Sequence, residues 1–191
     1  MRKTEIIENI NSKKISYKVS LGGIVAALCL VMMFLTAVFP LLYMTLPLFA
    51  GMLISVVAIE VSTSWAFVTY IVVSILSFFI TPDKEAAIFF AFLFGYYPVL
   101  KDFVDKMNFR PLRILIKFAV YDAAMALIFY FTIYIFGTLD IFEEFGFLNK
   151  FMIPVLFVVL NLILALYDYS LTIIKAAYVK WFRPTFLRKF K

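Results

Sequence analysis

The chain has 191 residues, of which 65% are apolar and none is histidine, and its formal net charge is +6. A soluble domain of this length would expose much of that apolar surface to water, so the composition excludes an ordinary soluble protein and predicts an all-α integral membrane protein. The single cysteine, Cys29, excludes an internal disulfide framework, and the lack of imidazole disfavours a metal site.

Basic residues are concentrated in three blocks. Sixteen of the 18 lysine and arginine residues fall within 2–18, 101–117 and 175–191, whereas the segment 140–144 is acidic. Cytoplasmic flanks of membrane helices accumulate lysine and arginine because positive charge resists translocation. The pattern predicts six membrane crossings with both termini in the cytoplasm, in a cell membrane that we expect to be bacterial.

The chain divides into three parts in order. Residues 1–18 are polar and basic with interspersed isoleucines, which is typical of an amphipathic helix on the cytoplasmic surface. Residues 19–174 form the predicted membrane domain, and residues 175–191 form a basic cytoplasmic tail. A perpendicular span takes roughly 20 residues. The six apolar segments are Val19–Phe39, Leu41–Ile59, Trp65–Ile80, Ala86–Leu100, Ile114–Phe136 and Phe151–Ile174.

Turn and cap signals separate these segments. Pro40 lies in a short uncharged connection between the first two, and Ser62–Ser64 can cap the third. Asp83, after Pro82, can cap the fourth. The run Gly95–Pro98 predicts a kink or an end of the fourth helix, because proline lacks a backbone donor and clashes with the preceding turn.

Small residues recur at helical spacing in the first apolar segment. Gly22 and Ala26 form one pair, and Gly23 and Ala27 form another. Such pairs let a second helix approach closely in lipid. The second helix belongs either to the same chain or to a partner subunit, and the sequence leaves both interpretations open.

Two acidic residues, Asp122 and Asp168, lie inside the last two apolar segments. An ionised side chain at membrane depth is costly, and such residues are functional candidates. One interpretation is that Lys117, Lys175 or a backbone group compensates them. The other is that they face one another, sharing a proton or a cation, which would permit an intramembrane aspartyl protease.

Polar and aromatic residues also mark a possible outward-facing pocket. Asn161 and the pair Tyr130 and Tyr134 are assigned to the outer halves of their helices, and Glu85 to the external start of the fourth. Pockets for flat organic ligands combine apolar walls with few polar groups, which these residues would supply. Asn161 has an alternative role in a hydrogen bond between helices.

The sequence lacks a phosphate-binding loop, a Ser/His or Cys/His arrangement and a metal-ligand cluster. We therefore expect no catalytic residue, no cofactor and no metal, and we do not expect an enzyme.

With this pattern, the chain resembles the substrate-binding S component of energy-coupling factor transporters, a subclass of ABC transporters. The resemblance covers about Lys18 to Lys180 and rests on size, six helices, cytoplasmic termini and the small residues of the first helix. The family's Ala-xxx-Ala signature is here Gly22-xxx-Ala26 and Gly23-xxx-Ala27. The resemblance implies uptake of a vitamin-like molecule, with a transmembrane coupling subunit and two ATPase subunits as partners. Because the basic residues flank the apolar segments, we expect anionic lipid of the bilayer, and no nucleic acid, as the partner of the positive charge.

Three other classes compete with this interpretation. A membrane scaffold or assembly factor would use the small-residue surface to dock to another integral membrane protein, without binding a ligand. A membrane-embedded hydrolase would depend on Asp122 and Asp168. A self-sufficient channel or transporter would need to oligomerise, and we rank it below the scaffold.

Overall fold

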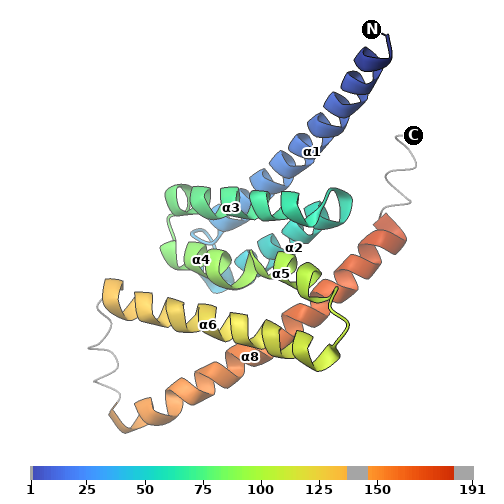
Figure 1. Ribbon diagram of the computed structural model, residues 1–191. Helices are drawn as coiled ribbons and strands as arrows, with labels where there is room; N and C mark the ends of the chain where they lie inside the picture. Colours follow the sequence, from blue (N-terminus) through green and yellow to red (C-terminus); the bar gives the residue numbers. More distant parts are fainter. Residues whose placement is uncertain (1, 137–145, 183–191) are drawn as a thin grey trace. The chain divides into compact units, whose positions relative to one another are not determined.

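The structure is a computed structural model that describes residues 2–136 and 146–182, and every regular element in these ranges is helical (Figure 1). The chain forms two compact units, Met1–Asp102 and Phe103–Lys191, which are described separately. The all-α class predicted from the sequence is confirmed for the described residues.

Three helices form the body of the first unit. They are α1 (Arg2–Leu35), α2 (Thr45–Glu60) and α3 (Thr63–Ile80), with a short 3₁₀ turn, η1 (Pro40–Leu42), before α2. Each of the three helices packs against the other two, and α3 crosses the C-terminal half of α1 (Figure 1). The expected connection around Pro40 is therefore a short turn between two packed helices.

One stripe of α1 faces the core of this unit. Val25, Cys29 and Met33 recur at four-residue spacing and are buried, while Ile24 and Leu28 beside them are exposed. Residues four apart lie on one face of a helix. The Cys29 thiol also donates a hydrogen bond to the carbonyl oxygen of Ala50 on α2, at 3.3 Å. The first helix thus has one side that packs internally and one that does not.

The first helix is longer than the first predicted segment. The predicted amphipathic segment 1–18 and the first apolar segment are parts of one helix, because α1 runs without a break from Arg2 to Leu35. No glycine or proline occurs between residues 2 and 21, so nothing in the sequence interrupts the backbone hydrogen bonds there.

The predicted helix caps are present. Ser62 accepts a hydrogen bond from the amide of Trp65 at the start of α3. Asp83 accepts from the amides of Glu85 and Ala86 at the start of α4 (Lys84–Phe89). The Lys84 ammonium turns back and donates to carbonyl oxygens of Phe78 and Thr81. These side chains pair backbone groups that helix ends leave unpaired.

The fourth apolar segment is interrupted rather than ended. After α4, a π-helical turn, η2 (Phe90–Phe94), leads to a bend at Gly95 and Tyr96, and α5 (Tyr97–Val104) continues beyond it. The Gly95 amide donates to the carbonyl oxygen of Phe90, five residues back. Of the two alternatives that the sequence left open, the structure shows the kink.

A close contact explains the glycine at this bend. A Cβ atom on Gly95 would lie 2.8 Å from the Tyr70 ring and 2.9 Å from the carbonyl oxygen of Phe90. The Tyr70 hydroxyl donates to the carbonyl oxygen of Ala91 at 2.8 Å, which joins α3 to the π-helical turn. The bend therefore depends on the absence of a side chain at Gly95.

The second unit contains two long helices. They are α6 (Arg110–Phe136) and α8 (Gly146–Ala177), and α8 continues into a π-helical turn, η3 (Tyr178–Phe182). Pro111 lies in the first turn of α6, where its missing amide is tolerated. α6 contacts α8.

Four helical segments in the described residues are long and apolar enough to cross a membrane, namely Ile15–Leu35, Thr63–Ile80, Lys84–Val104 and Phe157–Trp181. α2 is shorter, with 16 residues, and α6 has 27 residues, part of whose side chains lie outside the described residues. The protein therefore has the apolar helices of a membrane protein, while the six crossings and the cytoplasmic termini stay predictions.

Candidate functional site

Lys117, on α6, forms ion pairs with two carboxylates. The Lys117 ammonium lies 2.8 Å from Oδ1 of Asp105 and 3.0 Å from Oδ1 of Asp168 on α8. The Lys117 side chain is 11% exposed, against 29% for Asp168 and 40% for Asp105. Charges taken out of water are tolerated when they are paired in this way. Compensation of Asp168 by Lys117 was one of the two interpretations of the sequence.

The second acidic residue has a different partner. Nδ2 of Asn161, on α8, donates to Oδ1 of Asp122 on α6 at 3.0 Å and to the carbonyl oxygen of Phe157 at 3.0 Å. The sequence had assigned Asn161 to the outer half of its helix and had not paired it with Asp122. The structure brings them into contact, and it assigns Asn161 the role of hydrogen bonding between helices that the sequence left as an alternative.

An aspartyl-protease pair requires two carboxylates that share a proton. Here each carboxylate is instead bound by a side chain of its own, Asp168 by Lys117 and Asp122 by Asn161. The arrangement is a seam of two polar contacts that ties α6 to α8.

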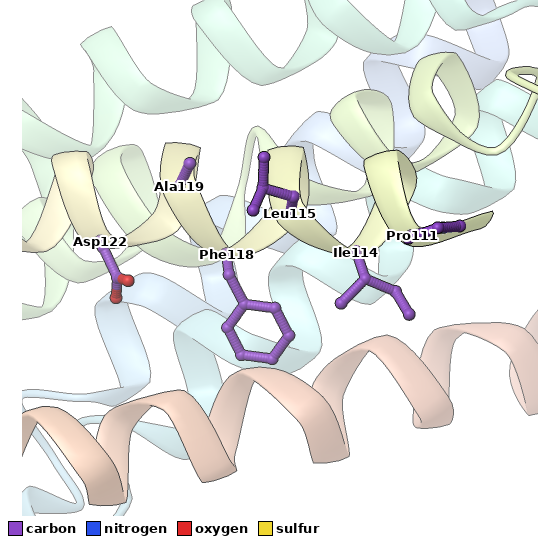
Figure 2. Close-up of a pocket in the computed structure, with 6 residues that line it drawn as sticks. All are labelled: Pro111, Ile114, Leu115, Phe118, Ala119 and Asp122. Carbon is purple, nitrogen blue, oxygen red and sulfur yellow. The ribbon is translucent and has the colours of Figure 1, made fainter. Parts of the chain in front are cut away.

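A hollow of about 480 Å³ lies along one face of α6 beside this seam (Figure 2). Its lining residues recur at three- and four-residue spacing, so they share one side of the helix. Phe118 and Asp122 point to the same side in Figure 2, and Asp122 supplies the acidic group of the lining. The lining consists of Pro111, Ile114, Leu115, Phe118, Ala119 and Asp122.

Tyr130, Tyr134 and Glu85 were the other residues predicted to line a pocket. Tyr130 lies on α6 and is 55% exposed. Tyr134 also belongs to α6, but its side chain is not among those that the structure describes. Glu85 is exposed in the first turn of α4, in the other unit. Asp105 was not singled out from the sequence, although its position within the basic block 101–117 was the available signal.

The two small-residue pairs of α1 face different ways. A Cβ atom on Gly22 would lie 3.3 Å from the Thr69 hydroxyl on α3, and Ala26 is partly buried against the core. Gly23 and Ala27 are exposed, and a Cβ atom on Gly23 would meet nothing within 4 Å. The first pair thus packs within the chain, and the second is left open.

Together, the fold and these contacts define a helical protein with membrane-length apolar segments, a polar seam between two helices and an open small-residue surface. No family model matches the chain, and neither a curated protein nor a solved structure shows significant similarity to it.

Proposed function

We propose that the protein is a membrane-embedded substrate-binding subunit for uptake of a vitamin-like small molecule, working with a separate ATP-driven coupling module. The observation that carries the proposal is the hollow on α6, with the Asp122–Asn161 contact at one end. Small-molecule sites typically combine mostly apolar walls with a few placed polar groups. The charge pattern of the sequence, which suggested an S component, also supports this role.

The open face of α1 supplies a docking surface for the coupling subunit. Gly23 and Ala27 are exposed one helical turn apart, so the backbone of a partner helix can approach there. Gly22 and Ala26 meanwhile hold α1 against its own chain. This division of labour lets one helix serve both the fold and the assembly. The proposed partners are one transmembrane coupling subunit and two ATPase subunits in a bacterial plasma membrane.

Affinity purification of the tagged protein in mild detergent, with mass spectrometry of proteins and small molecules, tests the proposal. We expect a coupling membrane protein, ATPase subunits and a bound metabolite. Recovery of other membrane proteins without an ATPase or a ligand would contradict the transporter role and support the scaffold.

A matched pair of variants localises the docking surface. Gly23→Leu fills the open space on α1, and we expect it to remove the coupling and ATPase subunits from the purified complex. Ile24→Leu changes an exposed neighbour without adding volume, and we expect the complex to persist. Equal recovery of partners with both variants would place the docking surface elsewhere.

A further inference from the structure

The acidic residues of the second unit differ in how their charge is balanced. Asp105 and Asp168 share the ammonium of Lys117, whereas the contact of Asp122 in the described part of the chain is the neutral amide of Asn161. An ionised carboxylate among apolar helices is costly without a countercharge. Asp122 is therefore the carboxylate for which a cationic ligand would supply the missing charge.

Asn161 holds Asp122 in place from α8. Its Nδ2 atom already donates to Asp122 and to the carbonyl oxygen of Phe157, while its Oδ1 atom is buried and has no hydrogen-bond partner among the described residues. The lining of the hollow in the described residues includes Asp122 but not Asn161, so a ligand with several N–H donors reaches the carboxylate.

The wall of the hollow suits an apolar body attached to such a donor. The hollow has a volume of about 480 Å³ and is an open groove, because its lining in the described residues comes from α6 alone. Phe118 lies one helical turn before Asp122 on the same side of α6, and Ile114 precedes it by another turn (Figure 2). Aromatic faces attract cations as well as flat apolar groups.

We infer that Asp122, held by Asn161, binds the ammonium group of an organic amine, whose apolar or aromatic body lies along Phe118 on α6. An ammonium group offers N–H donors and one positive charge, both of which match a carboxylate. The inference rests on the proposed function in that the amine would be the substrate taken up. The polar seam then has two parts, a structural ion pair at Lys117 and a ligand site at Asp122.

Calorimetric titration of the full-length protein in phosphatidylcholine nanodiscs tests the inference. The probes are phenethylammonium and its neutral counterpart, phenethyl alcohol. We expect the wild-type protein to bind phenethylammonium at least about tenfold more tightly, as a charge-assisted hydrogen bond predicts. Binding of neither probe, or equal binding of both, would overturn the inference without any variant.

Variants then assign the preference to Asp122. Asp122→Asn should abolish the preference for the ammonium probe, and Asp122→Glu, which keeps the charge, should retain it. Asp105→Asn removes a carboxylate that pairs with Lys117 and lies outside the proposed ligand site. This variant should bind phenethylammonium as tightly as the wild type does. An undiminished preference in Asp122→Asn would refute the assignment.

Two further arms separate related outcomes. Phosphatidylethanolamine in the nanodiscs competes with phenethylammonium if the natural occupant is a lipid amine, and leaves its affinity unchanged if the occupant is a free solute. Ammonium binding without recovery of ATPase subunits would support this site and contradict the proposed transport role. Recovery of ATPases with an anionic or neutral ligand would support the proposed transport role and contradict the ammonium site.

Discussion

The ion pair at Lys117 gives the most direct test of the second unit. Lys117→Met removes the ammonium and keeps a long side chain, leaving Asp105 and Asp168 without their shared partner. Removing one partner of a fully buried pair costs about 3–5 kcal/mol, and an exposed pair contributes about 0–1 kcal/mol. Because Lys117 is 11% exposed but Asp168 is 29% exposed, we expect an intermediate loss of about 2 kcal/mol.

A double-mutant cycle isolates the contact between the helices. Asp168→Asn alone should cost about 1 kcal/mol, since Lys117 keeps Asp105. The coupling energy between Lys117→Met and Asp168→Asn should be about 1 kcal/mol, within the range of interhelical polar contacts in membrane proteins, which average about 0.6 and reach about 1.7 kcal/mol. Reversible unfolding in mixed micelles, followed by circular dichroism, measures all four proteins.

Lys106→Met is the matched control for this cycle. It removes one positive charge from the same basic block, but its side chain is exposed. Its combination with Asp168→Asn should be additive within about 0.5 kcal/mol. A coupling energy near zero in the Lys117 cycle, or an equal coupling energy in the Lys106 cycle, would refute the specific contact between α6 and α8.

Three further predictions concern the first unit. Gly95→Ala should lower the free energy of unfolding by about 1–3 kcal/mol because the added Cβ atom meets Tyr70, whereas Gly23→Ala should not destabilise the protein. Unfolding in mixed micelles compares the two variants, and equal stabilities would contradict the close contact at Gly95. Asp83→Ala should cost about 1 kcal/mol and speed amide exchange at the start of α4. Cys29 is fully buried, so maleimide should label it only after denaturation. Rapid labelling of the folded protein would contradict the burial of Cys29 on the side of α1 that faces the core.

Local sequence signals predicted much of the helix pattern. The caps at Ser62 and Asp83 were predicted because side-chain oxygens before an apolar run pair free amides wherever the helix packs. For the run Gly95–Pro98 the sequence left a kink or a helix end open, and the structure shows a bend at Gly95 and Tyr96. The continuous α1 was not predicted, because the change from polar to apolar residues at Lys18 marks a change of surroundings and leaves the backbone hydrogen bonds intact.

By itself, the sequence determined the all-helical, apolar character of this protein and its distribution of charge. These follow from composition and from chemistry within one or two helical turns. Which side of each helix packs against another helix was decided only by the tertiary structure. A helix that is apolar on every side has no polar face from which the sequence could predict its buried side. Packing alone buried Gly22 and left Gly23 open, and it brought Asn161 to Asp122 and Lys117 to Asp168.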